Sequence, residues 1–487
     1  MQPCSNGARW LDSPLDSGMI GESVEHPQYG RGRIVAQYRN GTEWMVHFAS
    51  GLRFRRSRLE FNGQRPRETL VSAGNLSRIV PMPMAPDHWE ARHLIESLRV
   101  GVAPAQRIRD LTIGLEAERK SLTQALHQAH SEGGATRAVL GEYGYGKSHV
   151  IELTTQEALD CNFLVAVTSL DLHELPPHRA FDIYGSLMRN LRYPQSDERG
   201  LGPLLAAITK TPALQAKFSE SAPEADDPLV CGLQALGESS SSDKRAAWQN
   251  WLMGGRKERW MDWAMKRSRP RGFRFPSIYR NSHNARQIAY LLTGISVLAR
   301  LAGYSGLCVL LDEAESYSLL YPYQRPKASL FFSAVVRAAL GNSAIRINPD
   351  GLPQHRFREY PIRYGGSQSL FFLFTVTHSD IPLEAWLEDE QILHLNHRYK
   401  AQEIDRFLEQ ALAFHTQAYA YEPDERHRKV CQGAAEHLGQ GMRSDHLNIR
   451  AAMRLSVELF DLLYLHPDYT AATLLSELRK SLSQQAI

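Results

Sequence analysis

The sequence predicts an α/β protein in which a parallel β-sheet lies between layers of helices, with a small all-β module before it and a helical region after it. From residue 89 to residue 400, short runs that are apolar throughout alternate with helical patterns, as is typical of strands covered on both faces. Residues 20–61 carry short alternating runs instead, which indicate half-buried strands. From residue 401 onward only helical spacing remains.

Length and composition are those of a globular protein with several domains. The chain has 487 residues, and its hydrophobic share of 43% and charged share of 22% argue against extensive disorder. A single core stops growing at roughly 250–300 residues, so we expect two or three domains. The net charge of +3 is too small to indicate a partner by itself.

Neither a disulfide framework nor a membrane anchor is indicated. The five cysteines lie far apart and form no C-x-x-C pair, which argues against a disulfide scaffold and a zinc site. No apolar run reaches the roughly 18–20 residues that span a bilayer, and the first residues lack the apolar core of a signal peptide. We therefore expect a cytoplasmic protein without membrane contact.

Four segments are expected along the chain. Residues 1–62 form the small barrel, with about five strands, and residues 63–88 contain several prolines without helical periodicity, which indicates a linker. Residues 89–400 form the α/β domain, with a helical insertion at about 200–300. Residues 401–487 form a helical lid. The strands of the parallel sheet are expected at residues 137–140, 163–168, 307–311, 370–376 and 392–395.

A glycine-rich loop follows the first of these strands. It matches the pattern G-x-x-x-x-G-K-S with the residues Gly141, Glu142, Tyr143, Gly144, Tyr145, Gly146, Lys147 and Ser148. The glycines let successive backbone N–H groups point at a phosphate, and the N-terminus of the next helix adds positive charge. Lys147 is expected to reach the β- and γ-phosphates, and Ser148 to ligate Mg²⁺. The sequence therefore predicts a P-loop NTPase that binds ATP with Mg²⁺.

Two acids follow the apolar run at residues 307–311. Ligands of open α/β sheets bind at the carboxyl ends of the strands, so we expect Asp312 and Glu313 beside the P-loop, on the adjacent strand. Asp312 would hold Mg²⁺ through water, and Glu313 would be the general base that polarises the attacking water. Glu315 is interpreted as an acid that fixes the loop.

Further polar residues could complete this site. Thr377 follows the strand at 370–376 and could position the attacking water; His378 could equally do so, and Thr377 could instead only cap the strand. Arg450 and Arg454 lie one helical turn apart, so either could reach the γ-phosphate from the lid. Two more arginines are possible fingers that complete the site of a neighbouring subunit: Arg325 and Arg337.

Two basic stretches are candidate nucleic-acid contacts. Residues 254–275 hold eight Lys or Arg against two acids, interleaved with aromatic residues. Cations neutralise phosphates and aromatic faces stack on bases, but the same pattern fits a solvated helix face whose aromatic residues pack inward. Arginines also crowd residues 52–58, where they could touch DNA, bind an acidic protein surface or block edge-to-edge aggregation.

Four stretches carry a family resemblance: ARHLIESLRVGVAPAQRIRDLTIGLEAE, VLGEYGYGKSHVIELTTQEAL, AAWQNWLMGG and GYSGLCVLLDEAES. They resemble the P-loop ATP-binding proteins of BREX-type phage-defence loci, the BrxC/BrxD-like group. The resemblance extends over about residues 89–470, and its most specific motifs are the loop ending in His149 and the W-x-x-W-L-x-G element at 248–254. His149 is accordingly counted among the residues that contact the nucleotide, as is Arg450.

This resemblance implies an AAA-like ATPase of the ASCE type and of the broad STAND/ORC kind. It also implies defence against phage DNA beside partner proteins such as a helicase or nuclease, and a homo-oligomer in which a neighbour's arginine completes the site. Separately, GESVEHPQYGRGRIVAQY resembles the Tudor- or SH3-like barrel at the C-terminus of UvrD/PcrA-type helicases. That barrel docks proteins such as RNA polymerase and can touch nucleic acid.

Two functions from different classes remain open at this point. The first is a Mg²⁺-dependent ATPase that works as a nucleotide-driven switch or motor on DNA. The alternative is an ATP-gated scaffold that recruits an effector through its barrel with little or no turnover. Glu313 favours the first function, because a scaffold has no need of a catalytic base. ATP turnover with and without duplex DNA discriminates between them.

Overall fold

The structure is a computed structural model, and it divides into two units, Met1–Pro83 and Met84–Ile487. Each unit is described by itself. The described residues are 21–26, 30–38, 43–48, 53–57, 86–102, 104, 107–223, 227–267, 278, 284–354, 359–377, 381–396, 399–443 and 447–484.

The N-terminal unit contains an antiparallel sheet with the strand order β1-β2-β3-β4. Side chains on one face of the sheet are buried: Ile34, Trp44 and Val46. Burial of one face explains why apolar and polar residues alternate along these strands in the sequence. The small all-β module is thereby confirmed, whereas its closure into a five-stranded Tudor- or SH3-like barrel stays a prediction. The strands are β1 (Ser23–His26), β2 (Gly30–Tyr38), β3 (Glu43–Phe48) and β4 (Arg53–Ser57).

The second unit is built on a β-sheet, of which seven strands lie in the described residues. All five strands expected from the sequence form, and they run parallel: β5 (Gly134–Gly141), β6 (Phe163–Ser169), β9 (Gly306–Asp312), β10 (Leu370–Val376) and β11 (Ile392–Leu395). Two short antiparallel strands, β7 (Leu191–Tyr193) and β8 (Ser196–Arg199), extend one edge. The sequence did not predict these two strands, because β7 has only three residues and β8 (SDER) is polar throughout and exposed, so neither shows the apolar run of a buried strand.

The strand order is β11-β5-β10-β9-β6-β7-β8. The acid-bearing strand β9 is therefore not adjacent to the P-loop strand β5, and that expectation is wrong. β10 lies between them and pairs with both. Every residue of β10 is buried, as a central strand of an apolar sequence requires.

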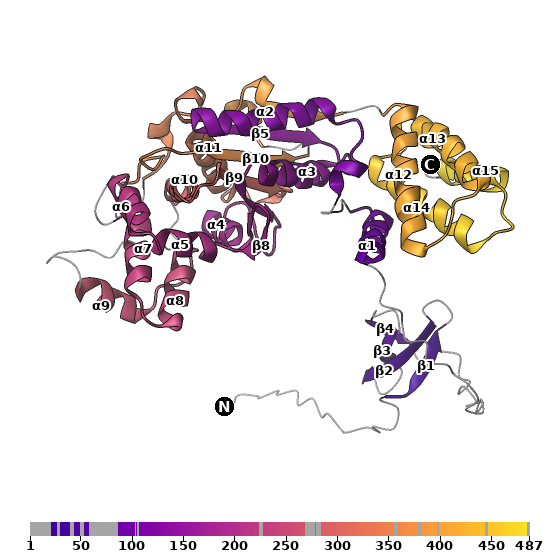
Figure 1. Ribbon diagram of the computed structural model, residues 1–487, viewed down its shortest axis with the longest axis horizontal. Helices are drawn as coiled ribbons and strands as arrows, with labels where there is room; N and C mark the ends of the chain where they lie inside the picture. Colours follow the sequence, from indigo (N-terminus) through magenta and orange to yellow (C-terminus); the bar gives the residue numbers. More distant parts are fainter. Residues whose placement is uncertain are drawn as a thin grey trace, which may run out of the picture. The chain divides into compact units, whose positions relative to one another are not determined.

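Helices cover both faces of this sheet (Figure 1). The sheet separates two hydrophobic cores, and successive residues of β10 point into them alternately. Phe371 and Leu373 belong to the core on one face, whereas Phe372 and Phe374 belong to the core on the other. The first face is covered by α2 (Glu116–Glu132) and α3 (Lys147–Asp160), and the second by α4 (Ala180–Arg189), α10 (Ala285–Leu301) and α11 (Arg325–Leu340). The predicted α/β fold of a P-loop NTPase is confirmed.

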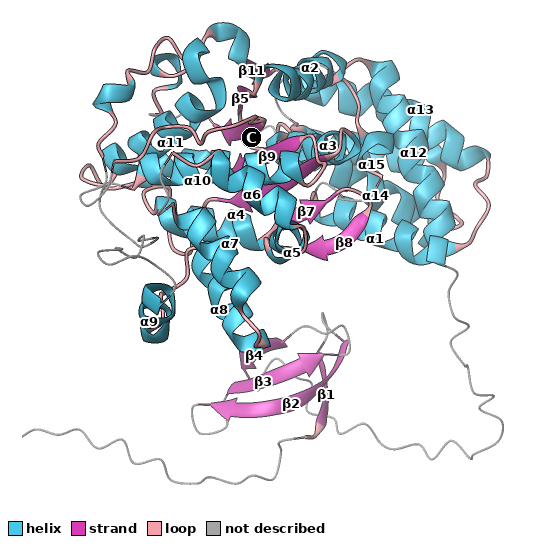
Figure 2. Ribbon diagram, turned by 60° about the vertical axis from the view of Figure 1, so that its left-hand side comes forward, coloured by secondary structure: helices cyan, strands magenta, loops and turns pink. Residues whose placement is uncertain are grey.

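In the described part of the chain, five short helices lie between α4 and α10 (Figure 2), within the segment expected as a helical insertion. Trp248 and Trp251 of the W-x-x-W-L element are both buried and pack edge to face, with ring centroids 5.7 Å apart, so the motif builds the interior of the insertion. The helices are α5 (Gly202–Thr209), α6 (Pro212–Glu220), α7 (Pro228–Glu238), α8 (Ser242–Leu252) and α9 (Arg259–Arg267).

The C-terminal helices have a core of their own, and it includes the first helix of the unit. Leu94, Ile95 and Leu98 of α1 (Pro86–Val100) are buried in it. The other helices are α12 (Ala401–Tyr419), α13 (Glu425–Arg443), α14 (Ile449–Leu465) and α15 (Ala471–Gln484). The 3₁₀ turns of this unit are η3 (Ile108–Leu111), η4 (Ala314–Leu319), η5 (Gly341–Ser343), η6 (Pro349–Gly351), η7 (Leu383–Ala385) and η8 (Asp389–Gln391).

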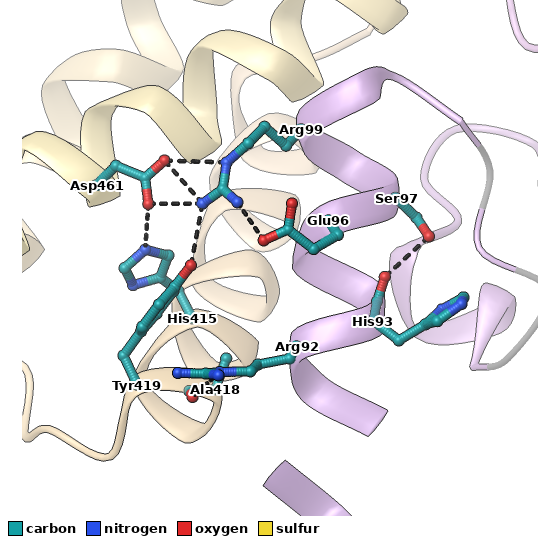
Figure 3. Close-up of polar contacts among 9 residues, drawn as sticks. All are labelled: Arg92, His93, Glu96, Ser97, Arg99, His415, Ala418, Tyr419 and Asp461. Atoms are coloured by element: carbon teal, nitrogen blue, oxygen red, sulfur yellow. Dashed lines mark hydrogen bonds and ion pairs between the residues drawn. The ribbon is translucent and has the colours of Figure 1, made fainter. Parts of the chain in front are cut away.

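A polar network fixes α1 to these C-terminal helices (Figure 3). Arg99 of α1 donates to both carboxylate oxygens of Asp461 on α14, at 2.8 and 2.9 Å, and to the Tyr419 hydroxyl at 3.1 Å. His415 Nε2 lies 3.2 Å from Asp461 Oδ1. α1 therefore packs with the C-terminal helices, although most of its residues were expected to belong to the α/β domain. Among the described residues, no helix combines the length and apolarity needed to cross a membrane.

Candidate nucleotide-binding site

The glycine-rich loop joins β5 to α3 through a tight turn. Gly144 and Gly146 have φ angles of +85° and +91°, in the left-handed region that residues with side chains rarely adopt. A Cβ atom at Gly144 would also lie 2.5 Å from the side chain of Asn448, the N-cap of α14. The glycines thus permit the turn, and Gly144 also permits the close approach of α14 to the loop.

Lys147 begins α3, and its side chain reaches back across the loop. Its Nζ donates to the carbonyl oxygens of Gly141 (3.0 Å) and Glu142 (3.4 Å) and to Thr377 Oγ1 (2.7 Å). Glu315 Oε1 lies 3.6 Å from Nζ and accepts a hydrogen bond from Thr377 Oγ1 at 2.8 Å. Lys147, Thr377 and Glu315 therefore form one polar cluster, in which the lysine is buried.

The two acids that follow β9 are oriented by different neighbours. Asp312 Oδ1 accepts hydrogen bonds from the Thr375 hydroxyl and from the backbone N–H of Glu313. Glu313 Oε2 accepts from Ser169 Oγ at 3.0 Å, so this carboxylate faces the end of β6. Glu313 also has a φ of +58°, a left-handed conformation that costs a residue with a side chain about 1–3 kcal/mol. Such strain is common at functional sites, where the surrounding structure enforces it.

The interposed strand β10 connects the P-loop to the acids. Thr375 lies on β10 and Thr377 just beyond it, two positions apart, so they share one side of the strand. Thr375 contacts Asp312, whereas Thr377 contacts Lys147 and Glu315. The two halves of the site are thus joined through threonine hydroxyls on the strand between them.

The C-terminal helices contact the loop through Arg450 of α14. Its Nη1 donates to the Tyr143 hydroxyl at 2.7 Å, and its guanidinium carbon lies 5.0 Å from the centroid of the Tyr143 ring. At exposed positions such cation–π contacts contribute roughly 0.5–1 kcal/mol. Arg450 also packs beside Gly101, and Arg454, one turn later, lies beside the same glycine. Of the two lid arginines, Arg450 is therefore the one that contacts the P-loop.

These elements surround one pocket. Its polar wall includes Lys147, Ser148, Asp312, Glu313 and Glu315. Its apolar wall is formed by Leu111, Ile113, Leu115, Tyr399, Phe407, Ile449 and Met453, and side chains of this kind suit the flat apolar faces of a purine. This apolar wall was not predicted from the sequence. Its only signal was the L-x-I-x-L spacing at 111–115, which a plain core segment would carry as well.

Two oxygen donors for a cation face the pocket. Ser148 and Asp312 both line it, and Mg²⁺ prefers oxygen ligands while keeping several waters. Among the described residues, no group of three or more His, Cys, Asp or Glu side chains is arranged to hold a metal ion. This donor set therefore fits a Mg²⁺ that arrives with a nucleotide, whose phosphate oxygens would supply further ligands.

His149 lies in the wall of the pocket as a neutral side chain. Thr112 Oγ1 donates to the Ile108 carbonyl (2.8 Å), and its oxygen lies 2.7 Å from His149 Nε2. Burial lowers the pKa of His149 to about 4. At neutral pH the ring is therefore uncharged, and it offers a phosphate no positive charge.

The other arginines singled out in the sequence are engaged elsewhere. Arg325 donates to two carbonyl oxygens of its own loop, and Arg337 donates to two carbonyl oxygens just beyond α11. Neither lines the pocket, so their role as fingers toward a neighbouring subunit stays a prediction. His378, the alternative to Thr377, lies outside the described residues.

The basic stretch at 254–275 is described only in part. Trp260 packs edge to face against a buried tryptophan of α8 at 5.6 Å, and Lys257 pairs with Asp262 at 2.7 Å. Residues 268–275 and the side chains of β4 lie outside the described residues. DNA contact by either basic stretch therefore stays a prediction.

Comparison with known protein families agrees with the P-loop geometry. Residues 87–222 match the family model described as BREX system ATP-binding protein BrxC/D. The matched segment contains α1, the whole P-loop and the helices up to α6, whereas Asp312, Glu313 and the C-terminal helices lie outside it. A comparison with curated proteins found no match. Residues 87–222 of this chain are therefore similar to the BREX system ATP-binding proteins BrxC/D.

Proposed function

We propose that this protein is a Mg²⁺-dependent ATPase that acts as a nucleotide-driven switch or motor in anti-phage defence in the bacterial cytoplasm. One observation carries the proposal: a single pocket combines the P-loop lysine, the acids after β9 and an apolar wall that suits a purine. The family match to BREX system ATP-binding proteins supports it.

In this proposal each residue of the pocket has a distinct task. Lys147 exchanges its contacts with Thr377 and Glu315 for the β- and γ-phosphate oxygens, and Thr377 is then free to orient the attacking water. Glu313 takes the proton of that water as general base. Ser148 and Asp312 would hold Mg²⁺, which neutralises the charge that develops on the phosphates.

The lid provides the proposed switch. Arg450 and Asn448 lie against the P-loop residues Tyr143 and Gly144, so a triphosphate that enters the loop must change this contact. ATP binding would then order the lid and the contacts between subunits, and hydrolysis would reset them. We further propose double-stranded DNA as a partner through residues 254–275 and the N-terminal module, a helicase or nuclease as partner protein, and a homo-oligomer as the active form.

The substitution Lys147→Ala tests the binding site. ATP affinity is expected to fall about 10- to 100-fold, because a hydrogen bond to a charged group contributes roughly 1.5–3 kcal/mol. Isothermal titration with ATP and Mg²⁺ measures the change, and Lys210→Ala on the protein surface is the matched control. Wild-type affinity and turnover in the Lys147 variant would refute the proposed site.

The substitution Arg450→Ala tests the lid contact. In the proposed ATP-bound state Arg450 leaves Tyr143 and reaches the γ-phosphate, so its loss is expected to lower ATP affinity about three- to tenfold, the size of an exposed charged contact of about 1 kcal/mol. Arg454→Ala removes the same charge one turn further along α14, and we expect less than about a twofold change. Equal losses in the two variants would mean that only the overall charge of the lid matters.

A further inference from the structure

The loop between the acids and α11 presents large apolar side chains to solvent. Leu319, Tyr321 and Tyr323 are 71%, 66% and 70% exposed, whereas Leu320 between them is buried. Single exposed apolar residues are ordinary, but a cluster at one place on a surface marks an interaction site. The pocket described above uses none of these side chains.

This loop is braced by its own hydrogen bonds. Arg325 donates to the carbonyl oxygens of Leu320 (3.3 Å) and Ser318 (2.6 Å), and the Tyr321 N–H donates to Gln324 Oε1 at 3.1 Å. The buried side chain of Leu320 anchors it to the core. The exposed side chains are therefore presented on a preorganised backbone, which lowers the entropic cost of binding.

The two tyrosine rings lie parallel and are stacked on one another with an offset. Their centroids are 5.7 Å apart, and their planes differ by 6°. We call Tyr321 and Tyr323 together the tyrosine platform. Both residues are mostly exposed, so a flat ligand can stack on the face of each ring that is turned away from the other ring.

The surroundings of the platform carry positive charge. Residues 316–330 contain no acid and two cations, Arg325 and Lys327. His178 Nε2 lies 3.4 Å from the side-chain nitrogen of Gln324. Burial lowers the pKa of His178, and the positive charges of Arg179 and Lys327 lower it further, whereas the negative charge of Asp182 raises it. Lys327 lies in the first turn of α11, three residues after Gln324, and Arg179 follows His178 in the chain. Both cations therefore belong to the segments that meet at the contact between Gln324 and His178.

We propose that the tyrosine platform binds single-stranded nucleic acid, with bases stacked on Tyr321 and Tyr323 and phosphates near Lys327 and Arg179. Stacking faces next to cations are the chemistry that single strands require, whereas an apolar protein partner needs neither parallel rings nor positive charge. Strand binding at this loop does not depend on the proposed ATPase function.

Four variants of the full-length chain distinguish binding by ring stacking from binding by apolar contact alone. The double substitution Tyr321→Ala/Tyr323→Ala removes both rings, and Tyr321→Phe/Tyr323→Phe keeps the stacking faces. Leu319→Ser is the matched control, because it removes an equally exposed apolar side chain from the same loop without removing a ring. Lys327→Ala tests the phosphate contact.

Binding is measured by fluorescence anisotropy with a labelled 20-nucleotide oligo(dT) strand at several salt concentrations, without nucleotide. The alanine double variant should bind at least about tenfold more weakly, since each stacked base contributes roughly 1–3 kcal/mol. The phenylalanine double variant and Leu319→Ser should stay within about threefold of wild type. Lys327→Ala should reduce the salt dependence of log K by about 0.7, the value for one phosphate on a single strand.

Several outcomes would overturn the proposal. One is that the wild type does not bind oligo(dT), and another is that the alanine double variant binds it as tightly as the wild type. A third is that Leu319→Ser loses as much affinity as the alanine double variant, which would indicate a site for an apolar protein surface. A further contradicting outcome comes from light scattering. If the alanine double variant has a lower molar mass than the wild type, this loop makes contacts between copies of the chain instead. ATP affinity measured on the same samples keeps a failure here distinct from a failure of the ATPase proposal.

Discussion

Glu313→Gln is expected to lower ATP turnover by at least about 100-fold, while ATP affinity stays within about threefold of wild type. A positioned general base contributes typically about 10²–10⁴-fold to a rate, and glutamine cannot take the proton from water. The amide keeps the shape of the side chain, and its oxygen can still accept the hydrogen bond from Ser169. Steady-state phosphate release and equilibrium titration with ATP measure the two quantities.

Glu315→Gln is the matched control, because it neutralises an acid two residues away in the same pocket. Glu315 contacts Lys147 and Thr377 rather than β6, so its loss should alter ATP affinity and reduce turnover by no more than about tenfold. If Glu315→Gln abolishes turnover and Glu313→Gln does not, the general base must be reassigned to Glu315. If the wild type turns over negligibly with and without duplex DNA, the ATP-gated scaffold becomes the better description.

The strands and the P-loop could be predicted from the sequence because their signals are local. An apolar run followed by a glycine-rich loop and a helix is contained in one stretch, and each residue type has a direct physical reason at its position. The order of the strands is not local. Placing β10 between β5 and β9 depends on pairing across more than 50 residues of chain, and the composition of the three strands is too similar to rank them.

The features that the sequence analysis missed share a different cause. The apolar wall of the pocket joins residues near 111, 399 and 453, and each alone is indistinguishable from core. Tyr321 and Tyr323 lie in a run rich in leucine and tyrosine, which suggests burial as readily as exposure. The left-handed backbone of Glu313 has no sequence signal, because glycine or asparagine is the usual residue there. These features arise from tertiary packing, which overrides local preference.

A buried carboxylate in the helical insertion, Asp227, contacts residues that are distant in the sequence. Asp227 is fully buried, and its Oδ1 accepts hydrogen bonds from the N–H groups of Leu229 (2.9 Å) and Val230 (3.0 Å) at the start of α7. Its Oδ2 accepts from the Tyr290 hydroxyl at 2.6 Å, and the Tyr364 hydroxyl lies 3.4 Å from Oδ1. Burial and the neighbouring carboxylate raise the pKa of Tyr364, so this hydroxyl remains a donor. Asp227 thus ties the insertion to α10 and to the segment before β10.

Asp227→Ala is expected to lower the free energy of unfolding by about 3–5 kcal/mol. The change removes an N-cap, which contributes roughly 0.5–2 kcal/mol to stability. It also leaves the buried tyrosine hydroxyls without an acceptor, which costs roughly 1–3 kcal/mol of stability for each hydroxyl. Urea denaturation followed by circular dichroism measures the loss. Asp227→Asn keeps one oxygen for the α7 amides and should lose less than half as much, because its NH₂ group can donate to the Tyr290 oxygen. A loss below about 1 kcal/mol for the alanine variant would show that α7 is fixed by its apolar contacts alone.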